Sequence, residues 1–454
     1  MKLFFILFLS LFILGCSGGG GDDTTETPRE TQLPSETINV AFLQTQQSTF
    51  QIPLVVILVD FDNQSMVDID LAWSQKVFGT FQGQLNDYFT EVSNNTFSFI
   101  PANENYNNND DGIIKVTLTS NHPNTSSPDT FKASVAAPAL SLANAFIDFS
   151  AYDTNGNLHI DKEELQIMFL VAGGELATGL MPGIWAHASC LDGQILDGVE
   201  VMQCTNGSYT AFGERHSDFG AGGTDATIGI IAHELGHGAF YLPDLYDTDG
   251  SSEGIGNFGL MGSGSWGFKA TEAQGETPVH MSAWSKYQSG FLTESTISIA
   301  SNNIAINETG FPTYQALKIK TQEPNEYFLI ENRSTSGYDA GMYSLDFTVF
   351  QGGLAIWHID ESQLNNVYPL TPNSVDNNRL VDLEEADSFH LDTNGNRGDQ
   401  TNLFYAGNSA PLYTGVLTPT STPANSNLYS GASTNISISN VSASSSIMYI
   451  DLNL

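Results

Sequence analysis

Residues 228–241 read IGIIAHELGHGAFY, and this stretch combines an apolar helical pattern with two histidines four positions apart. Ile228, Ile231 and Leu235 recur at the spacing of one helix face, which predicts a helix that packs into a core. Positions i and i+4 lie one turn apart on the same face, so His233 and His237 can reach a single metal ion. We therefore expect the fold to be built around this helix.

Glu234 completes the pattern H-E-x-x-H with these two histidines. Imidazole nitrogens bind zinc at about 2.0–2.1 Å, and a catalytic zinc keeps one position open for water or substrate. Glu234 is expected to face that open side and to act as general base, taking a proton from the zinc-bound water. The alternative interpretation is a helix that carries two exposed histidines and no metal.

A catalytic zinc needs a third protein ligand, and the sequence after the helix offers three candidates. Pro243 must end the helix, and Asp244 on the turn that follows is the first carboxylate after His237. Asp247 and Glu253 are the alternatives, although the Gly/Ser-rich surroundings of Glu253 are not typical of a helix. We expect Asp244 to be the ligand.

The segment HELGHGAFYLPDLYDTDGSSEGIGNFGLMGSGSWG, residues 233–267, strongly resembles the immune inhibitor A-like secreted bacterial metallopeptidases. The resemblance implies a zinc endopeptidase whose third ligand is the Asp of Leu-Pro-Asp, here Asp244, and a hydrophobic floor under the metal at Met261. YFTEVSNNTF, GIWAHAS, EYFLIENR and GGLAIWHID resemble the same family, so the likeness runs from about residue 50 to 410. One departure from metzincin spacing is that Asp244 lies seven residues after His237 instead of six.

The charge of the chain limits its partners. Lys and Arg number 14 against 51 Asp and Glu, so the formal net charge is −37. Nucleic-acid binding needs clustered Lys and Arg, and docking on anionic lipid needs basic residues, so both are excluded as defaults. The expected partner is a protein or peptide substrate, and we expect a monomer.

The N-terminus reads as a processing segment. Leu3 to Leu14 is an apolar run too short to span a bilayer, and it has the size of the apolar part of a signal peptide. Gly15-Cys16 after this run resembles a bacterial lipobox, which implies lipid attachment at Cys16; an ordinary secretory signal is the alternative. We expect a flexible acidic linker over residues 17–48. The protein would then be lipid-anchored to the outer membrane or cell surface, or released extracellularly.

Two further cysteines remain, Cys190 and Cys204. An even pair in an exported chain predicts one disulfide that closes a short loop, with free thiols as the alternative.

Two Asn/Asp-rich segments suggest structural calcium. Residues 153–164, DTNGNLHIDKEE, place oxygen groups at the ligand positions of an EF-hand-like loop, with Leu158 where glycine is usual. The ligands would be Asp153, Asn155, Asn157, the carbonyl of His159, Asp161 and Glu164. A turn that needs no ion is the alternative. A less complete second set comprises Asp392, Asn394, Asn396 and Asp399.

The remaining pattern predicts an α/β (α+β) zincin-like domain over residues 49–297, with a mixed twisted sheet and the active-site helix. Buried strands are expected at 50–62 and 165–172, and helices at 70–94 and 131–149. From residue 298 to 454 short alternating segments predict a β-rich C-terminal region.

The sequence therefore predicts a secreted or surface-anchored zinc endopeptidase that uses metal-activated water. Two other function classes stay open: a calcium-stabilised surface binding protein with a relic zinc site, and a zinc hydrolase that does not act on peptides.

Overall fold

A computed structural model describes residues 40–46, 48–217, 223–295, 301–345, 347–364, 373–374, 378–393 and 396–454. Residues 37–454 form one compact unit. The predicted signal peptide, Cys16 and most of the predicted linker lie outside the described residues. Within the described ranges, no helix has the length and apolar character needed to cross a bilayer.

The first sheet is mixed and has eight strands, ordered β11-β10-β5-β2-β3, with β4 also on β2, β6 on β5 and β7 on β10. β2, β3, β4, β5, β6 and β10 all run parallel to one another. β7 and β11 both pair antiparallel with β10. The strands are β2 (Phe50–Phe61), β3 (Phe97–Pro101), β4 (Ile113–Leu118), β5 (Gln166–Glu175), β6 (Gly183–Ile184), β7 (His187–Ser189), β10 (Tyr209–His216) and β11 (Thr224–Asp225). The predicted central strands thus appear as β2 and β5.

Both faces of this sheet are buried, which explains why its central strands are continuous apolar runs. Successive side chains of β2 alternate between two cores. Leu54, Val56 and Leu58 enter the core that contains the active-site helix, whereas Val55 and Ile57 enter the core under α3 and α4.

The helices of this half are shorter than the sequence pattern predicts. The single helix expected over 70–94 is two helices, α1 (Asp70–Phe78) and α2 (Leu85–Val92), because Gly79 ends α1 and Gly83 adopts a φ of 84° between them. The helix expected over 131–149 is α3 (Pro128–Phe131), a π-helical turn and α4 (Ala137–Ala143). Pro138 lacks the N–H that a continuous α-helix requires there.

The second sheet is antiparallel, with the order β12-β1-β14-β15-β16-β17. Its strands are β1 (Val40–Thr45), β12 (Leu292–Ser295), β14 (Gln315–Lys320), β15 (Glu326–Arg333), β16 (Gly353–Asp360) and β17 (Val381–Leu383). β1 corrects the predicted linker over 17–48, which was too long at its C-terminal end. Phe42 and Leu43 enter two different cores on opposite faces of the sheet, so this segment is a buried strand.

The C-terminal region is β-rich, as predicted. β13 (Ile304–Asn307), β18 (Ser437–Ser439) and β19 (Ile447–Asn453) form a three-stranded sheet, and β8 (Ile195–Leu196) pairs with β9 (Val199–Glu200) in a separate hairpin. The boundary expected at residue 297 falls on residues 296–300, outside the described residues. Short 3₁₀ helices cover 149–152, 176–178, 256–258, 263–266, 337–344, 361–363 and 400–402.

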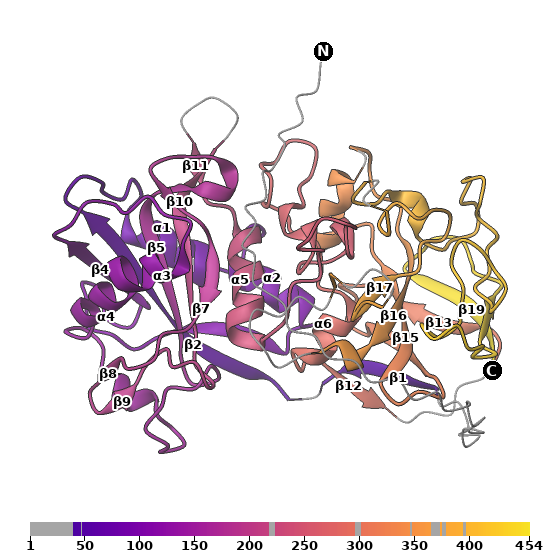
Figure 1. Cartoon of the computed structure of the whole chain (residues 1–454), viewed down its shortest axis with the longest axis horizontal. Coiled ribbons are helices and arrows are strands. Elements are labelled where there is room, and N and C mark those ends of the chain that lie inside the picture. Colours follow the sequence, from indigo (N-terminus) through magenta and orange to yellow (C-terminus); the bar gives the residue numbers. More distant parts are fainter. Residues whose placement is uncertain are drawn as a thin grey trace, which may run out of the picture. The chain divides into compact units, whose positions relative to one another are not determined.

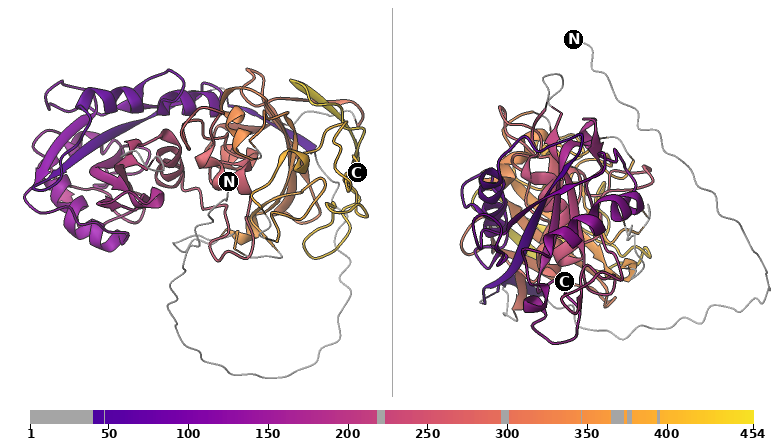
Figure 2. Two further views of the ribbon diagram at one scale, coloured as in Figure 1. Left: turned by 90° about the horizontal axis from the view of Figure 1, so that it is seen from above. Right: turned by 90° about the vertical axis from the view of Figure 1, so that its left-hand side faces the viewer.

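The predicted active-site helix is α5 (Ile228–Phe240), and it lies between the two sheets (Figures 1 and 2). Its buried residues share one core with β2 of the first sheet and with β14, β15 and β16 of the second. α6 (Ala283–Gln288) contributes Trp284 to the same core. Both sheets therefore hold the helix.

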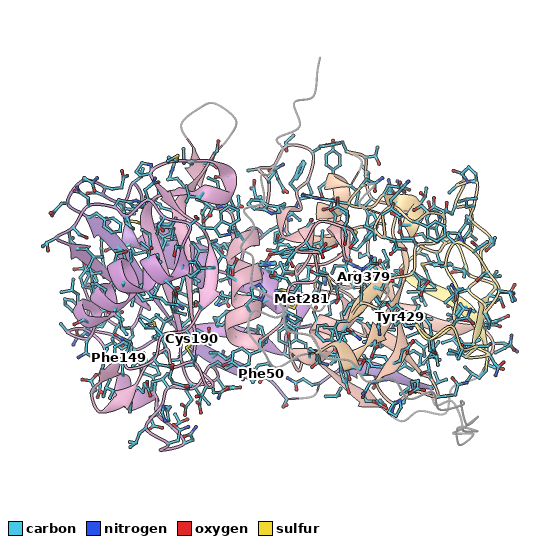
Figure 3. The ribbon with its side chains drawn as sticks, in the orientation of Figure 1. Phe50, Phe149, Cys190, Met281, Arg379 and Tyr429 are labelled. Atoms are coloured by element: carbon cyan, nitrogen blue, oxygen red, sulfur yellow. A yellow bond between two sulfur atoms is a disulfide. The ribbon has the colours of Figure 1, made fainter. Side chains whose placement is uncertain are left out.

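Cys190 and Cys204 form the predicted disulfide, which closes the loop that contains the β8–β9 hairpin. Cys190 is labelled in Figure 3.

A buried histidine joins the C-terminal segment to the second sheet. The ring of His358 lies between Phe328 and Tyr429, with centroids 4.4 Å and 4.2 Å away. Its Nε2 lies 2.9 Å from Glu326 and its Nδ1 lies 3.2 Å from Glu384. Burial by itself lowers the pKa of His358, but the two carboxylates raise it to about 9. The imidazolium is therefore an ion-pair centre at neutral pH.

The pH dependence of stability should carry the signature of His358. Its pKa is raised from 6.5 in the unfolded chain to about 9. Its stabilisation is thus complete below about pH 6.5 and is lost as the pH rises through about 9, a term on the order of 3 kcal/mol. In urea titrations, His358→Gln should lower the free energy of unfolding much more at pH 6 than at pH 10. An equal loss at both pH values would contradict the ion-pair role.

Candidate metal centre

The end of α5 turns the chain back toward the helix. Tyr241 adopts a left-handed conformation with a φ of 52°, and its N–H donates to the His237 carbonyl at 3.0 Å. The Leu242 N–H donates to the Gly236 carbonyl at 3.1 Å. The helix therefore ends before Pro243, and the reversal brings Asp244 to the face that carries the histidines.

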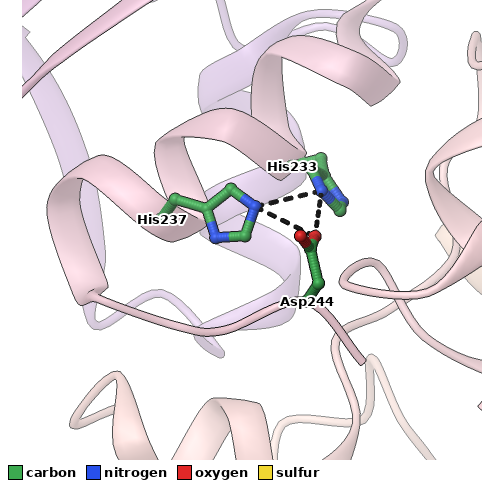
Figure 4. Close-up of side chains that lie close together, drawn as sticks. All are labelled: His233, His237 and Asp244. Atoms are coloured by element: carbon green, nitrogen blue, oxygen red, sulfur yellow. Dashed lines mark hydrogen bonds and ion pairs between the residues drawn. The ribbon is translucent and has the colours of Figure 1, made fainter. Parts of the chain in front are cut away.

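Three side-chain atoms of His233, His237 and Asp244 converge at this face (Figure 4). The two Nε2 atoms lie 3.2 Å apart, and the Asp244 Oδ1 lies 3.1 Å from His233 Nε2 and 3.2 Å from His237 Nε2. Ligands at 2.0–2.1 Å around a tetrahedral zinc are about 3.4 Å apart, so the observed triangle has nearly the size that zinc requires.

Backbone carbonyls orient both rings. The Nδ1 of His233 donates to the Leu260 carbonyl at 2.9 Å, and the Nδ1 of His237 donates to the Leu242 carbonyl at 2.5 Å. A carbonyl only accepts, so each Nδ1 carries a proton and each Nε2 of a neutral ring turns a lone pair toward Asp244. The sequence gives no sign of these two carbonyls, because they belong to apolar residues of ordinary type.

The residues present fit a divalent cation. With both rings neutral, two nitrogen lone pairs and a carboxylate oxygen face one another, and these three acceptors have no donor among themselves. Two imidazoles and one carboxylate form the donor set of a catalytic zinc site.

The charges at the cluster also favour a bound cation. Burial works to lower the pKa of His237, but the Asp244 carboxylate raises it to about 9. Burial works to raise the pKa of Asp244, but His237 and His233 hold it well below its usual range. The carboxyl group is thus ionised and strongly attracts positive charge.

Glu234 follows His233 on α5 and is buried, and its charge acts on a second carboxyl group, Glu175, that the sequence interpretation missed. Burial raises the pKa of Glu175, at the end of β5, to about 7, and the negative charge of Glu234 adds to this effect. Three backbone N–H groups, from Ala177, Ala186 and Gly213, donate to Glu175 and oppose the shift. The sequence signal that could have revealed Glu175 is its place as an acidic residue at the end of a buried apolar strand.

Comparison with known proteins agrees with this chemistry. Residues 70–292 match the family model described as immune inhibitor A peptidase M6, catalytic domain. This segment is similar to the catalytic domain of an M6 peptidase, and we refer to it as the M6 domain. The matched region is shorter than the 50–410 suggested by the sequence resemblance, and it contains the whole metal cluster.

Two curated relatives of the M6 domain are both named Pre-pro-metalloprotease PrtV, from Vibrio cholerae serotype O1 strains M66-2 and ATCC 39315 / El Tor Inaba N16961. Each is 33% identical over 161 residues, which cover 33% of this chain. The aligned part spans 16% of the length of either relative. Both comparisons agree with the enzyme class expected from the sequence, a metallopeptidase.

The two alternative third ligands are engaged elsewhere. Asp247 accepts hydrogen bonds from the N–H groups of Asp249 and Ser252 and closes a turn. Glu253 lies 3.4 Å from Arg397. Among the described residues of the M6 domain, Asp244 is the carboxylate that joins the histidines.

Met261 lies against α5. A Cβ at Gly236 would meet the Met261 sulfur at 2.6 Å, so the helix and this side chain are in close contact. Met261 is 1% exposed. The residue suggested as a hydrophobic floor thus contacts α5 at Gly236, one position before His237.

The EF-hand-like segment folds as a compact loop. Asp153 accepts the N–H groups of residues 156, 157 and 158, and Glu164 accepts those of residues 154, 155 and 161. Leu158 has a φ of 65°, the conformation that usually requires glycine at this position. Leu158 thus adopts a left-handed conformation where glycine is usual, and calcium binding by this loop stays a prediction.

The second calcium set is not brought together in the same way. Asp392 pairs with Arg379, Asp399 caps the helix at 400–402, and Asn396 contacts His390. Asn394 lies outside the described residues. This set stays a prediction.

The contact between Gly236 and Met261 makes a testable prediction. Gly236→Ala gains about 1 kcal/mol of helix propensity but incurs about 1–3 kcal/mol of overpacking, so it should be neutral to destabilising. In a Met261→Ala background the clash is removed, and the same substitution should raise the free energy of unfolding. Urea titration of wild type, both single variants and the double variant measures this. If Gly236→Ala changes the free energy of unfolding by the same amount in both backgrounds, the contact is absent.

Proposed function

We propose that the chain is an exported, zinc-dependent endopeptidase that hydrolyses peptide bonds in proteins or peptides. The observation that carries this proposal is the triangle of His233 Nε2, His237 Nε2 and Asp244 Oδ1 at 3.1–3.2 Å, beside a buried glutamate on the same helix. The family match supports the same class of reaction.

His233, His237 and Asp244 would hold the zinc ion. Bound there, zinc supplies a Lewis acid for the scissile carbonyl and lowers the pKa of water to about 7. The Leu260 and Leu242 carbonyls keep both Nε2 atoms aimed at the ion position. Glu234 accepts a proton from the attacking water and passes it to the leaving amine nitrogen. The hydroxyl group of the water is thus added to the acyl carbon and its proton to the amine.

The substrate would bind as an added strand at the edge of the first sheet. β7 pairs with β10 at that edge and packs against α5. An extended peptide beside β7 could use main-chain hydrogen bonds for affinity and pockets for alternate side chains. Such binding tolerates many sequences, which suits an endopeptidase.

Substitutions can separate the general base from the ligands. Glu234→Ala should leave zinc bound at one ion per chain and lower turnover of casein by roughly 10²–10⁴-fold, because the base is lost but the ligands remain. Asp244→Ala should lose both zinc and activity. Asp247→Ala is the matched control, because it removes a carboxylate three residues further along that closes a turn, and it should keep zinc.

Metal analysis and protein digestion on the full chain decide among the function classes. Wild type with trace zinc and no cleavage would favour the binding protein with a relic site. Zinc-dependent hydrolysis of esters or glycans without peptide cleavage would favour the other hydrolase. Full activity in Glu234→Ala would overturn the role of Glu234.

We also propose a structural calcium ion in the loop at 153–164. The loop carries the carboxylates of Asp153, Asp161 and Glu164, and the left-handed conformation of Leu158, where glycine is usual in an EF-hand, supports the proposal. Millimolar-range calcium outside the cytoplasm would fill such a site.

Calcium should raise the thermal midpoint of the zinc-loaded protein at about 1 mM, because an ion that binds the folded state alone stabilises it. Asp161→Ala should lose this increase. Glu163→Ala removes the same charge from a position without a ligand role, and it should keep the increase. Equal responses in both variants would exclude the loop as the site.

The localisation rests on the N-terminal segment, which lies outside the described residues. We propose cleavage before Cys16 and lipid attachment at its thiol, with residues 17–39 as a tether. The names of the two relatives, which mark them as pre-pro-proteins, support export.

A further inference from the structure

A glycine-rich segment lies behind the metal cluster and carries the groups that orient it. Residues 254–262 read GIGNFGLMG, with glycine at four of nine positions, and we name them the support segment. The Leu260 carbonyl accepts from His233 Nδ1 at 2.9 Å. The Met261 carbonyl accepts from the N–H of Leu245, the residue after Asp244, at 2.9 Å. Two of the three zinc ligands therefore depend on it.

The support segment needs contacts from outside to hold one conformation. Glycine has more backbone freedom than any other residue, so a segment this rich in it has little stiffness of its own. A misplaced Leu260 carbonyl would release the ring of His233 and let its Nε2 turn from the cluster.

Arg333, at the end of β15 in the second sheet, supplies such a contact. Its side chain is fully buried, and its Nη1 donates to the Phe258 carbonyl, two residues before Leu260, at 2.5 Å. The other side of the guanidinium forms a two-bond pair with Asp339, with Nε 3.0 Å from Oδ2 and Nη2 on Oδ1. The rigid fork of arginine allows all three bonds at once.

Asp339 fixes the opposite side of the support segment. Its Oδ1 accepts the His280 N–H at 3.3 Å, and the His280 carbonyl accepts the Leu260 N–H at 3.3 Å. Thr309 and the N–H of Ser334 also donate to Asp339, so the carboxylate is itself held in place. The Arg333–Asp339 ion pair is thus hydrogen-bonded to Phe258 directly and connected to Leu260 through His280.

We propose that Arg333, together with Asp339, is a positioning residue for the zinc site, acting through the support segment on His233. Arg333 lies beyond the matched region of 70–292, so the second sheet completes the metal centre. The inference rests on the proposed zinc site and adds a residue that acts on zinc affinity without contacting the ion.

A nearby lysine provides the matched control. Lys286 is buried like Arg333, and its Nζ lies 3.5 Å from Glu331, a carboxylate in the same ion network. No hydrogen bond described for Lys286 reaches the support segment. Loss of either cation should destabilise the fold, but loss of Arg333 alone should loosen His233.

The experiment measures zinc affinity by competition with a chromogenic chelator, on the full chain and at neutral pH. Arg333→Met should raise the zinc dissociation constant about tenfold or more, the usual effect of losing an outer partner of a metal ligand. Lys286→Met should bind zinc like wild type. The zinc-induced increase in the thermal midpoint should shrink in the first variant and persist in the second.

A second variant covers the case in which Arg333→Met does not fold. The double variant Arg333→Met/Asp339→Asn leaves no unpaired charge in the core, and it should fold and still bind zinc more weakly than wild type. Wild-type affinity in a folded Arg333 variant would overturn the inference while the proposed function stands. If wild type itself binds no zinc, the proposed function fails first.

Discussion

When both rings are neutral, three lone pairs of His233, His237 and Asp244 face one another across about 3 Å, and the rest of this structure depends on this constraint. Such an arrangement is unfavourable unless a cation or protons occupy the centre, so the fold must hold it in place. Helix spacing sets two of the three atoms, and the chain reversal at Tyr241 sets the third. The remaining freedom, the rotation of each ring, is removed by a carbonyl.

The molecule supplies these restraints from parts far apart in the sequence. α5 fills the space between the two sheets, so its buried face contacts both, and the support segment closes the metal cluster from behind. Arg333 links the second sheet to the support segment through the Phe258 carbonyl, and Glu326, the ion-pair partner of His358, accepts the N–H of Tyr429 in the C-terminal segment. A region that resembles an appendage in sequence is therefore structurally part of the metal centre.

The elements that sequence predicted best are those whose signal is local. α5 begins and ends where the apolar spacing and Pro243 indicate, and β2 and β5 follow their apolar runs, because both patterns are complete within about a dozen residues. The choice of Asp244 over Asp247 came from chain order together with family resemblance, since spacing by itself left both open. Gly79 and Gly83 mark the break between α1 and α2, but the apolar spacing continues across them and predicts a single helix.

What sequence could not predict are partners without a side-chain signature or without proximity in the chain. β1 is the clearest case, since Val40 lies opposite Ile319 and the interval is 319 − 40 = 279 residues. A chain made from its N-terminus at 5–20 residues per second would leave β1 waiting for about 15–60 s before β14 exists. The first sheet can collapse during that time, whereas the second must close late around a strand synthesised at the outset. Completion of the second sheet is therefore tied to the arrival of residues 292–320, and a nascent chain interrupted before β12 would keep an unpaired apolar strand.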